Sequence, residues 1–401
     1  MPAAPPLPGR DIGLPGRRGW PQPVLTLLLV SLMAGLVGLP FLIVAANRLV
    51  TGQGVGLLAL LAGGWWTPLA PLGLLAVVAL WRTPSLQRAL HGATALASAA
   101  LLIGLVAFAG DAAARQAAQL PALARVSLGG GFWLAVLLAW AIFADALPRT
   151  PLNQRGQWVC HGLLLLALAL LLALGALDAL SVLKEYANRR DVFHAALWRH
   201  LQIVATALAA ALALGLPLGL AAARHVRLAR PLFALLNVVQ TVPSIALFGL
   251  LIGPLAWLGQ ALPGSGLQGI GLLPAVVALV LYAQLPIVHG VVTGLQQVPA
   301  SVIDAANGMG MREWQRLRQV EIPLALPVWV SALRLTAVQL VGLAVVAALI
   351  GAGGLGAIIF QGLLSSALDL VLLGVLPVVA LALAVDAAFR WLAWRMAELP
   401  Q

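Results

Sequence analysis

VPASVIDAANGMGMREWQRLRQVEIP, residues 298–323, separates two long apolar runs in the second half of the chain. The segment is too polar to cross a bilayer and too regular to be a flexible linker. Pro299 suits the first turn of a helix, and Asp304, Ala305 and Ala306 continue that helix. A first short helix is therefore predicted at the start of this segment.

Two glycines divide the segment, because Gly308 and Gly310 permit a sharp change of direction. A second helix is predicted to follow, and Pro323 marks the return into the membrane. On physical grounds two interpretations are open: a rigid lever moved by a soluble partner, or an interfacial helix lying on lipid headgroups. The second helix would carry an apolar stripe at three-residue spacing, formed by Met311, Trp314, Leu317 and Val320.

The composition indicates the environment of the chain. Of its 401 residues, 62% are hydrophobic and 9% are charged, against about 25% charged in soluble domains. Continuous apolar runs of about 20 residues recur along the sequence, which predicts an all-α, polytopic helical membrane protein with about ten spans. The spans are predicted at 24–46, 55–81, 90–109, 131–147, 158–182, 200–223, 232–258, 270–297, 323–350 and 370–393.

The basic residues predict the orientation of the spans. Lys and Arg collect in the cytoplasmic loops of membrane proteins, so the net charge of +11 does not require a nucleic-acid partner. With the N-terminus inside, most of the 23 basic residues fall on the inner side, and both termini are predicted to be cytoplasmic. The inner residues are Arg10, Arg17, Arg18, Arg82, Arg88, Arg149, Arg155, Arg224, Arg227, Arg230, Arg312, Arg316, Arg318, Arg390 and Arg395.

A polar stretch near the middle predicts how the chain is divided. Residues 1–23 form a cytoplasmic tail, and 24–183 form a block of about five spans that begins with a retained span rather than a cleaved signal. Residues 184–199 form an extracytoplasmic connector, either an amphipathic surface helix or an ordinary polar link. The C-terminal core is predicted at 200–396 and contains the cytoplasmic segment 298–323.

The segment 298–323 resembles the EAA loop of ABC importer permeases. The pattern of that loop is E-A-A, three residues, G, nine residues and I-x-L-P. Asp304, Ala305 and Ala306 occupy the first positions, followed at the family spacing by Gly310, Val320, Ile322 and Pro323. The departures are Asp for Glu, Val for Ile and Ile for Leu.

The resemblance extends from about His200 to Arg395 and is closest to permeases for glycine betaine, choline and carnitine. Two further stretches, near 125–133 and 184–189, resemble a longer branch of that family with extra spans before the core. The supporting stretches in the core are GLPLGLAAAR (215–224), QTVPSIALFGLL (240–251) and ALIGAGGLG (348–356).

The resemblance implies a methionine-permease-like core of five spans in each of two permease subunits, which are identical or different. In the lipid bilayer, two cytoplasmic ABC ATPases would dock on the two EAA loops, and an extracytoplasmic substrate-binding protein would deliver a compatible solute. ATP-Mg would bind to the ATPase, and no cofactor to this chain. On this resemblance, the residues that contact the ATPase are Asp304, Ala305, Ala306, Gly310, Met311, Trp314, Leu317, Val320, Ile322 and Pro323.

Polar residues inside the core spans are candidates for lining a transport path, or for hydrogen bonding between helices. Pro243 and Pro286 lie within predicted spans and should kink or break them. An arginine within a span either has a function at mid-bilayer or extends its side chain to the inner edge. The candidates are Asn237, Gln240, Ser244, Tyr282, Gln284, His289 and Arg334.

The sequence lacks the motifs that a nucleotide-binding protein, an ATPase or a metal-binding protein would require. Gly351, Gly353 and Gly356 match G-x-G-x-x-G but follow an apolar helix, so a turn or gate is predicted there and not a nucleotide site. No Walker lysine motif occurs, and Cys160 is the single cysteine, so neither ATP hydrolysis nor a metal site is expected. The chain is predicted to be a transport subunit and not an enzyme.

Two alternative transport functions remain. One is an ABC permease for another small substrate, such as an amino acid. The other is an ion-coupled secondary transporter or channel, which would usually carry carboxylates near mid-bilayer. None of the acids between residues 200 and 395 is predicted at that depth, which favours the ATP-driven importer.

Overall fold

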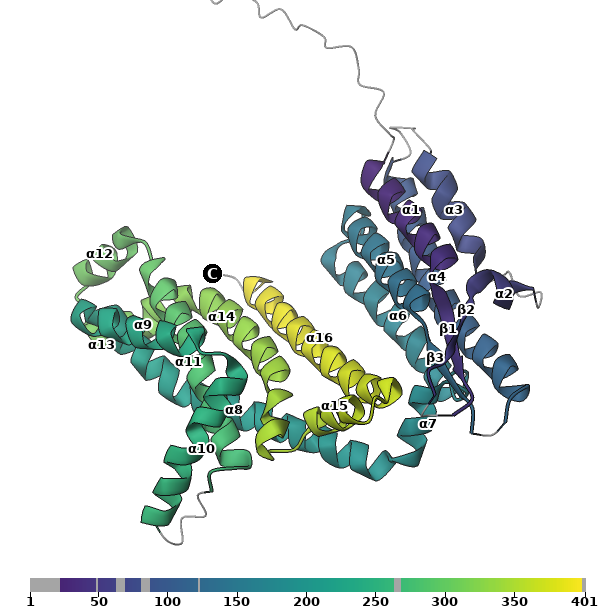
Figure 1. Ribbon diagram of the computed structural model, residues 1–401. Helices are drawn as coiled ribbons and strands as arrows, with labels where there is room; N and C mark the ends of the chain where they lie inside the picture. The colour runs from purple at the N-terminus through teal and green to yellow at the C-terminus, as the bar shows by residue number, and fades with distance from the viewer. Residues whose placement is uncertain are drawn as a thin grey trace, which may run out of the picture. The chain divides into compact units, whose positions relative to one another are not determined.

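The computed structural model describes residues 22–47, 50–62, 69–80, 87–121, 123–262 and 268–398. The chain divides into two compact units, Met1–Lys184 and Glu185–Gln401 (Figure 1). Most of the predicted tail 1–23 lies outside the described residues, as do five basic residues used to predict the orientation. These five are Arg10, Arg17, Arg18, Arg48 and Arg82.

The N-terminal unit is mainly helical, as predicted. Its longest helix is α4, which packs against α3, α5 and α6. The elements of this unit are α1 (Pro23–Gly38), β1 (Pro40–Ala45), β2 (Gln53–Gly56), α2 (Leu57–Leu61), α3 (Ala70–Leu80), α4 (Gln87–Ala118), β3 (Arg125–Leu128), α5 (Gly130–Ala146), η3 (Leu147–Arg149) and α6 (Gln154–Ala173); α7 (Ser181–Asn188) contains the boundary between the units.

A three-stranded antiparallel sheet, in the order β2-β1-β3, is an addition to the predicted all-α architecture. Leu42 of β1 pairs with Val55 on one side and Leu128 on the other. Beside it, Phe41 is fully buried, and its ring lies edge-on to Phe108 and Phe132 with centroids 5.6 Å away. The sheet therefore joins α4 and α5 through one aromatic cluster.

The first two predicted spans were wrong in their extent. The first was expected to continue to residue 46, but α1 ends at Gly38 because Leu39 is extended and Pro40 cannot continue a helix. The second was expected at 55–81, but the described part of that run begins in β2 and then forms the short helices α2 and α3.

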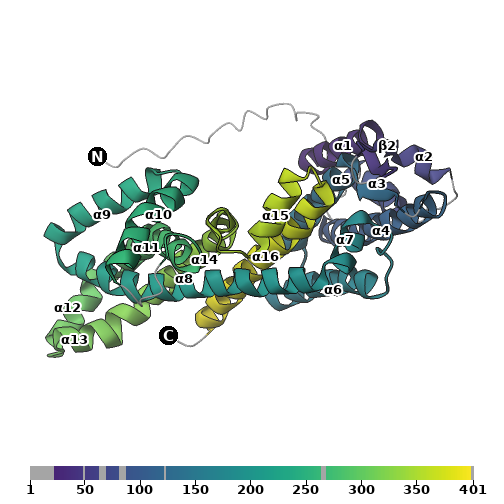
Figure 2. The same cartoon turned by 60° about the horizontal axis from the view of Figure 1, so that its bottom comes forward.

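The C-terminal unit is a helical bundle around α11, which packs against α8, α9, α10 and α14. Both views place α12 and α13 at one end of this unit and α15 at the other (Figures 1 and 2). Its elements are α8 (Arg190–Arg224), α9 (Val226–Thr241), α10 (Ser244–Ala261), α11 (Leu272–Gln296), α12 (Ala300–Gly308), α13 (Glu313–Arg316), η4 (Leu317–Glu321), α14 (Ile322–Leu343), η5 (Val346–Ile350), α15 (Leu355–Leu364) and α16 (Leu368–Glu398).

Two predicted core spans are divided in the structure. The run 232–258 forms α9 and α10, because Val242 and Pro243 are extended and interrupt the helix; the predicted break at Pro243 is thus confirmed. The run 323–350 forms α14 and the 3₁₀ helix η5. The turn predicted for the following glycines is also present, with left-handed φ angles of 79° at Gly351 and 82° at Gly353.

Helices α8 and α11 approach closely because α8 presents small residues at four-residue spacing. Ala207, Ala211, Gly215 and Gly219 are all buried on this face. A Cβ atom added at Gly219 would lie 2.6 Å from the Cβ atom of Val291 on α11. Small residues allow helix backbones to approach in this way within a membrane.

Eight helices of the described ranges have the length and composition of a membrane span. The chain is therefore polytopic and predominantly α-helical, as predicted. These helices are Arg88–Ala118, Gly130–Arg149, Gln154–Ala173, Arg190–Arg224, Ser244–Ala261, Leu272–Gln296, Glu313–Leu343 and Leu368–Met396.

The close packing of α8 and α11 generates a first prediction. The substitution Gly219→Leu should lower the free energy of unfolding by about 1–3 kcal/mol, because the added side chain overpacks the contact. Thermal unfolding of the purified protein in detergent would measure the change. Gly249→Leu on α10 is the matched control, since a Cβ atom there meets nothing within 4 Å. Equal unfolding temperatures for the two variants would contradict the packing argument.

Candidate functional site

The first half of the segment 298–323 forms α12 (Ala300–Gly308), as predicted. Pro299 precedes the helix in an extended conformation. At the other end, Gly310 adopts a left-handed φ angle of 76°, and its N–H donates to the carbonyl of Asn307 at 2.9 Å. Glycine is the residue best suited to such a turn.

The motif residues of α12 divide between its two faces. Asp304 and Ala305 are exposed, whereas Ala306 is 1% exposed. Met309, at the end of the helix, is 70% exposed. The outer face of α12 therefore offers a carboxylate and an apolar side chain to a partner.

The second helix of the segment was predicted to include Met311 in its apolar stripe, and this is wrong. The Met311 N–H donates to the carbonyl of Ala306 at 3.2 Å, so Met311 belongs to the turn that ends α12. Helix α13 begins at Glu313, after the Arg312 N–H is capped by the Gln315 side chain at 3.0 Å.

The second helix is also not a separate short element. The π-helical turn η4 (Leu317–Glu321) joins α13 directly to α14, giving one continuous helix of 31 residues, Glu313–Leu343. Within the predicted stripe, Trp314 is 66% exposed, whereas Leu317 and Val320 are half-buried. The stripe is therefore not one uniform face.

The two remaining motif positions begin α14. Ile322 is half-buried, and Pro323 is exposed in the first turn of the helix. Proline has no backbone N–H to donate, so a helix tolerates it best in its first turn. Pro323 is in the first turn of α14, directly after the π-turn, where the regular α-helical hydrogen-bond pattern is already interrupted. These residues therefore mark where the loop becomes a long helix.

Glu321 connects the segment to the bundle. Its side chain is buried, with Oε2 2.7 Å from Arg224 Nη2 on α8 and Oε1 2.8 Å from Arg316 Nε on α13. Arg316 Nη1 also donates to Asn307 Oδ1 of α12 at 2.6 Å. We name Asn307, Arg316, Glu321 and Arg224 the Glu321 cluster.

The Glu321 cluster is not evident from the sequence. The one indication in the sequence is the position of Glu321, an acid between the basic residues of the segment 298–323 and the apolar start of α14. A carboxylate in that position requires a partner when it is buried. Its partner Arg224 is 97 residues away along the chain, so the pairing depends on the tertiary fold.

Gln240 and Tyr282, two of the predicted path-lining residues, connect helices. Gln240 Nε2 donates to the carbonyl of Tyr282 at 2.6 Å, and the Tyr282 hydroxyl donates to the carbonyl of Val242. Val242 lies in the break between α9 and α10, where carbonyl groups lack helical partners. The Tyr282 side chain therefore satisfies a carbonyl at the helix break, and the Gln240 side chain bonds α9 to a carbonyl within α11. Both have the alternative role considered for them, hydrogen bonding between helices.

The other polar candidates have separate neighbours. Gln284 is buried and its Nε2 donates to the carbonyl of Ala211 on α8 at 3.3 Å. His289 is exposed, and its ring is edge-on to Phe233 of α9 with centroids 6.0 Å apart. Asn237 is exposed on α9, and Ser244 is half-buried at the start of α10. The structure thus brings Gln240 and Tyr282 together, places His289 against another part of α9, and directs Gln284 to α8.

Arg334, within α14, faces α16. Its Nε lies 3.7 Å from Asp386 Oδ1, and Arg390 Nη2 lies 2.6 Å from Asp386 Oδ2. The side chains of Arg334 and Asp386 are 42% and 29% exposed. An arginine in a spanning helix is stabilised by such a carboxylate, so Arg334 has a structural partner.

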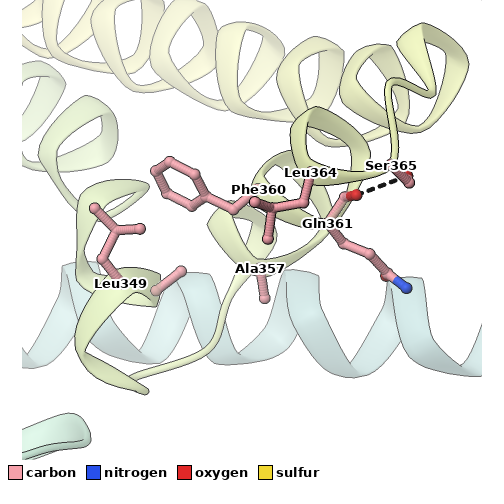
Figure 3. A pocket seen from close by; sticks show the side chains of 7 residues that line it. Leu349, Ala357, Phe360, Gln361, Leu364 and Ser365 are labelled. Atoms are coloured by element: carbon pink, nitrogen blue, oxygen red, sulfur yellow. Dashed lines mark hydrogen bonds between the residues drawn. The ribbon is translucent and has the colours of Figure 1, made fainter.

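A shallow apolar pocket lies between η5 and α15, with a volume of about 560 Å³. Gln361 is its main polar side chain, and the backbone carbonyl of Gln361 accepts a bond from the Ser365 hydroxyl at 2.8 Å (Figure 3). None of the predicted path-lining residues contributes to it. Within the described ranges, no three His, Cys, Asp or Glu side chains are grouped as a metal site requires.

Both halves of the chain match known protein families. Residues 215–398 match the family described as binding-protein-dependent transport system inner membrane component. Residues 18–183 match the N-terminal domain of the ABC transporter permease YehY. The osmoprotectant import permease OsmW of Salmonella typhimurium is 41% identical over 199 residues, which are 50% of this chain and 87% of OsmW.

The chain belongs to the ABC importer permeases. The carnitine transport permease OpuCB of Listeria monocytogenes is 38% identical to this permease, over 50% of this chain and 85% of the relative. A chain of the MetNI methionine ABC transporter, solved in an inward-facing conformation (CY5 native crystal form), is 25% identical to this permease. The match covers 52% of this permease and 98% of that chain, with a TM-score of 0.48. The permease is thus a multi-pass inner-membrane transport component, as predicted.

The helix break generates a second prediction. Tyr282→Phe should lower the free energy of unfolding by about 1–3 kcal/mol, because the carbonyl of Val242 loses its hydrogen-bond donor. Tyr186→Phe is the matched control, since the Tyr186 hydroxyl bonds to His194 at an exposed site. Thermal unfolding in detergent would compare them, and an equal loss in both variants would contradict the role of Tyr282.

Proposed function

We propose that this permease forms the membrane path of an ATP-driven importer for a compatible solute such as glycine betaine, carnitine or choline. The supporting observation is the similarity to osmoprotectant permeases over nearly their whole length, 87% for OsmW and 85% for Listeria OpuCB. A permease of the same machine for another small substrate, such as an amino acid, is the alternative.

The partners are proposed from the architecture of the segment 298–323. Two cytoplasmic ABC ATPases would dock on α12 and α13 of two permease subunits, and ATP-Mg would bind to the ATPases. A substrate-binding protein would deliver the solute on the opposite side of the membrane. The exposed Asp304, Met309 and Trp314 support this docking, because they offer charge and apolar surface on a rigid element.

The acidic residues of the bundle support ATP drive over ion coupling. Glu321 and Asp386 are each paired with two arginines. Asp304 lies on α12 and Glu313 is the first residue of α13, both within the segment 298–323. Both carboxylates already have two cationic partners each, so neither is free to bind a coupling ion.

The distribution of polar side chains suggests where substrate selection occurs. A tight site for a quaternary ammonium group is usually an aromatic cage. Tyr282 is 4% exposed and is packed in the hydrophobic core of the bundle, so its ring face is not open to a cation. We therefore assign selection to the binding protein and transient passage to the permease.

Reconstitution tests the proposed function. The permease is placed in proteoliposomes with its ATPase and binding protein, and uptake of labelled glycine betaine is measured. Uptake should require ATP and the binding protein. Uptake by the permease alone under an ion gradient would contradict ATP drive, and saturable uptake of an amino acid in place of glycine betaine would favour the alternative substrate.

Exposed tryptophans generate a third prediction. Trp314→Ala should reduce the amount of ATPase that copurifies with the permease by about tenfold, since interface tryptophans often dominate binding energy. Trp257→Ala is the matched control, because Trp257 on α10 is 68% exposed and Trp314 is 66% exposed. Copurification would be quantified after detergent extraction. Equal ATPase recovery with Trp314→Ala and with the control would contradict docking at α13.

A further inference from the structure

We propose that Glu321 is a positioning residue that transmits movement of α12 to the membrane-spanning helices α8 and α14. This inference rests on the proposed function, in which an ATPase moves α12. The movement would be transmitted through the Glu321 cluster, that is, through the buried carboxylate and its three partners.

The first step is the geometry of the carboxylate. Each oxygen of Glu321 holds an arginine from a different helix: Arg224 in the last turn of α8, and Arg316 in α13. Glu321 itself is the residue before α14. One side chain therefore joins α8 to the continuous helix Glu313–Leu343 at a single point.

The second step is the connection to α12. Arg316 bonds to Glu321 through Nε and to Asn307 through Nη1, so its planar guanidinium bridges α12 and the π-turn. Helix α12 also packs against α13 and the π-turn. A displacement of α12 would therefore pull on Glu321 through Arg316.

The third step is the environment of the bonds. The side chains of Glu321 and Arg316 are 6% and 14% exposed. Charge-assisted hydrogen bonds with little exposure are short and strong, and loss of one partner leaves a buried charge unpaired. The connection is therefore stiff, as force transmission requires.

Helices α8 and α14 are also connected at a second place, away from Glu321. The Arg199 Nε of α8 donates to the carbonyl of Ala352 at 3.0 Å, and His200 Nε2 is 3.2 Å from the carbonyl of Val341 on α14. Helix α14 is thus joined to α8 near both of its own ends. A movement imposed at Glu321 would be carried by the pair to the glycine turn at Gly351–Gly354.

The test measures coupling in the whole reconstituted complex. Glu321→Gln keeps the size of the side chain and removes its charge. The number of labelled glycine betaine molecules taken up per ATP hydrolysed should fall by about tenfold, within the usual range of coupling between sites. Asp191→Asn, which removes an exposed acid in the first turn of α8 and leaves α12 and α13 unchanged, should stay within about twofold of the wild type.

A second variant avoids leaving a buried charge unpaired. Asn307→Ala cuts the bond between α12 and Arg316 but preserves both bonds to Glu321. It should also lower solute uptake per ATP, while the exposed Gln319→Ala should not. Measuring the ratio in assembled complexes separates coupling from assembly, because a purely structural role would reduce the yield of complex and leave the ratio unchanged.

The outcomes are distinguishable from failure of the proposed function. If the wild-type complex shows no ATP-driven uptake, the proposed function fails. If the wild type transports and Asn307→Ala assembles with an unchanged ratio, the role of the Glu321 cluster is overturned. A lower ratio in Asn307→Ala, with controls at the wild-type value, supports it even if Glu321→Gln does not fold.

Discussion

A carboxylate removed from water must be paired, and Glu321 meets that requirement with two arginines from different helices. Those bonds decide where α13 ends, how α8 meets α14, and how α12 is held through Asn307. The segment 298–323 is therefore part of the bundle and not a loose connection below it. Removing the carboxylate would leave the largely buried Arg316, whose side chain is 14% exposed, without its ion-pair partner.

The lipid environment explains most of the remaining polar contacts. Backbone groups in a bilayer have no water to bond to, so the break between α9 and α10 requires the Tyr282 hydroxyl at the carbonyl of Val242. Arg334 likewise requires Asp386. Small residues also allow close contact between helices, as at Gly215 and Gly219 against α11. Polar residues in these spans thus support the architecture before any transport role is assigned to them.

Much of this architecture could be predicted from the sequence, and the failures have physical causes. Apolar runs predicted the spans, and Pro243 predicted a break, because both are local properties. The strand β1 was missed because PFLIVA is as apolar as a helix and becomes a strand only by pairing with Val55 and Leu128. Met311 was assigned to the wrong element because its N–H caps α12. The Glu321 cluster was missed because Arg224 is distant in sequence.

The π-turn Leu317–Glu321 constrains the number of residues in the segment 298–323. A π-turn contains one residue more than an α-helical turn, and each residue of a helix turns the chain by about 100°. Trp314 faces its present direction because of that extra residue. A deletion of one residue here would turn α13 about its own axis and point Trp314 elsewhere. Unlike most surface loops, which tolerate changes in length, this segment has a fixed length.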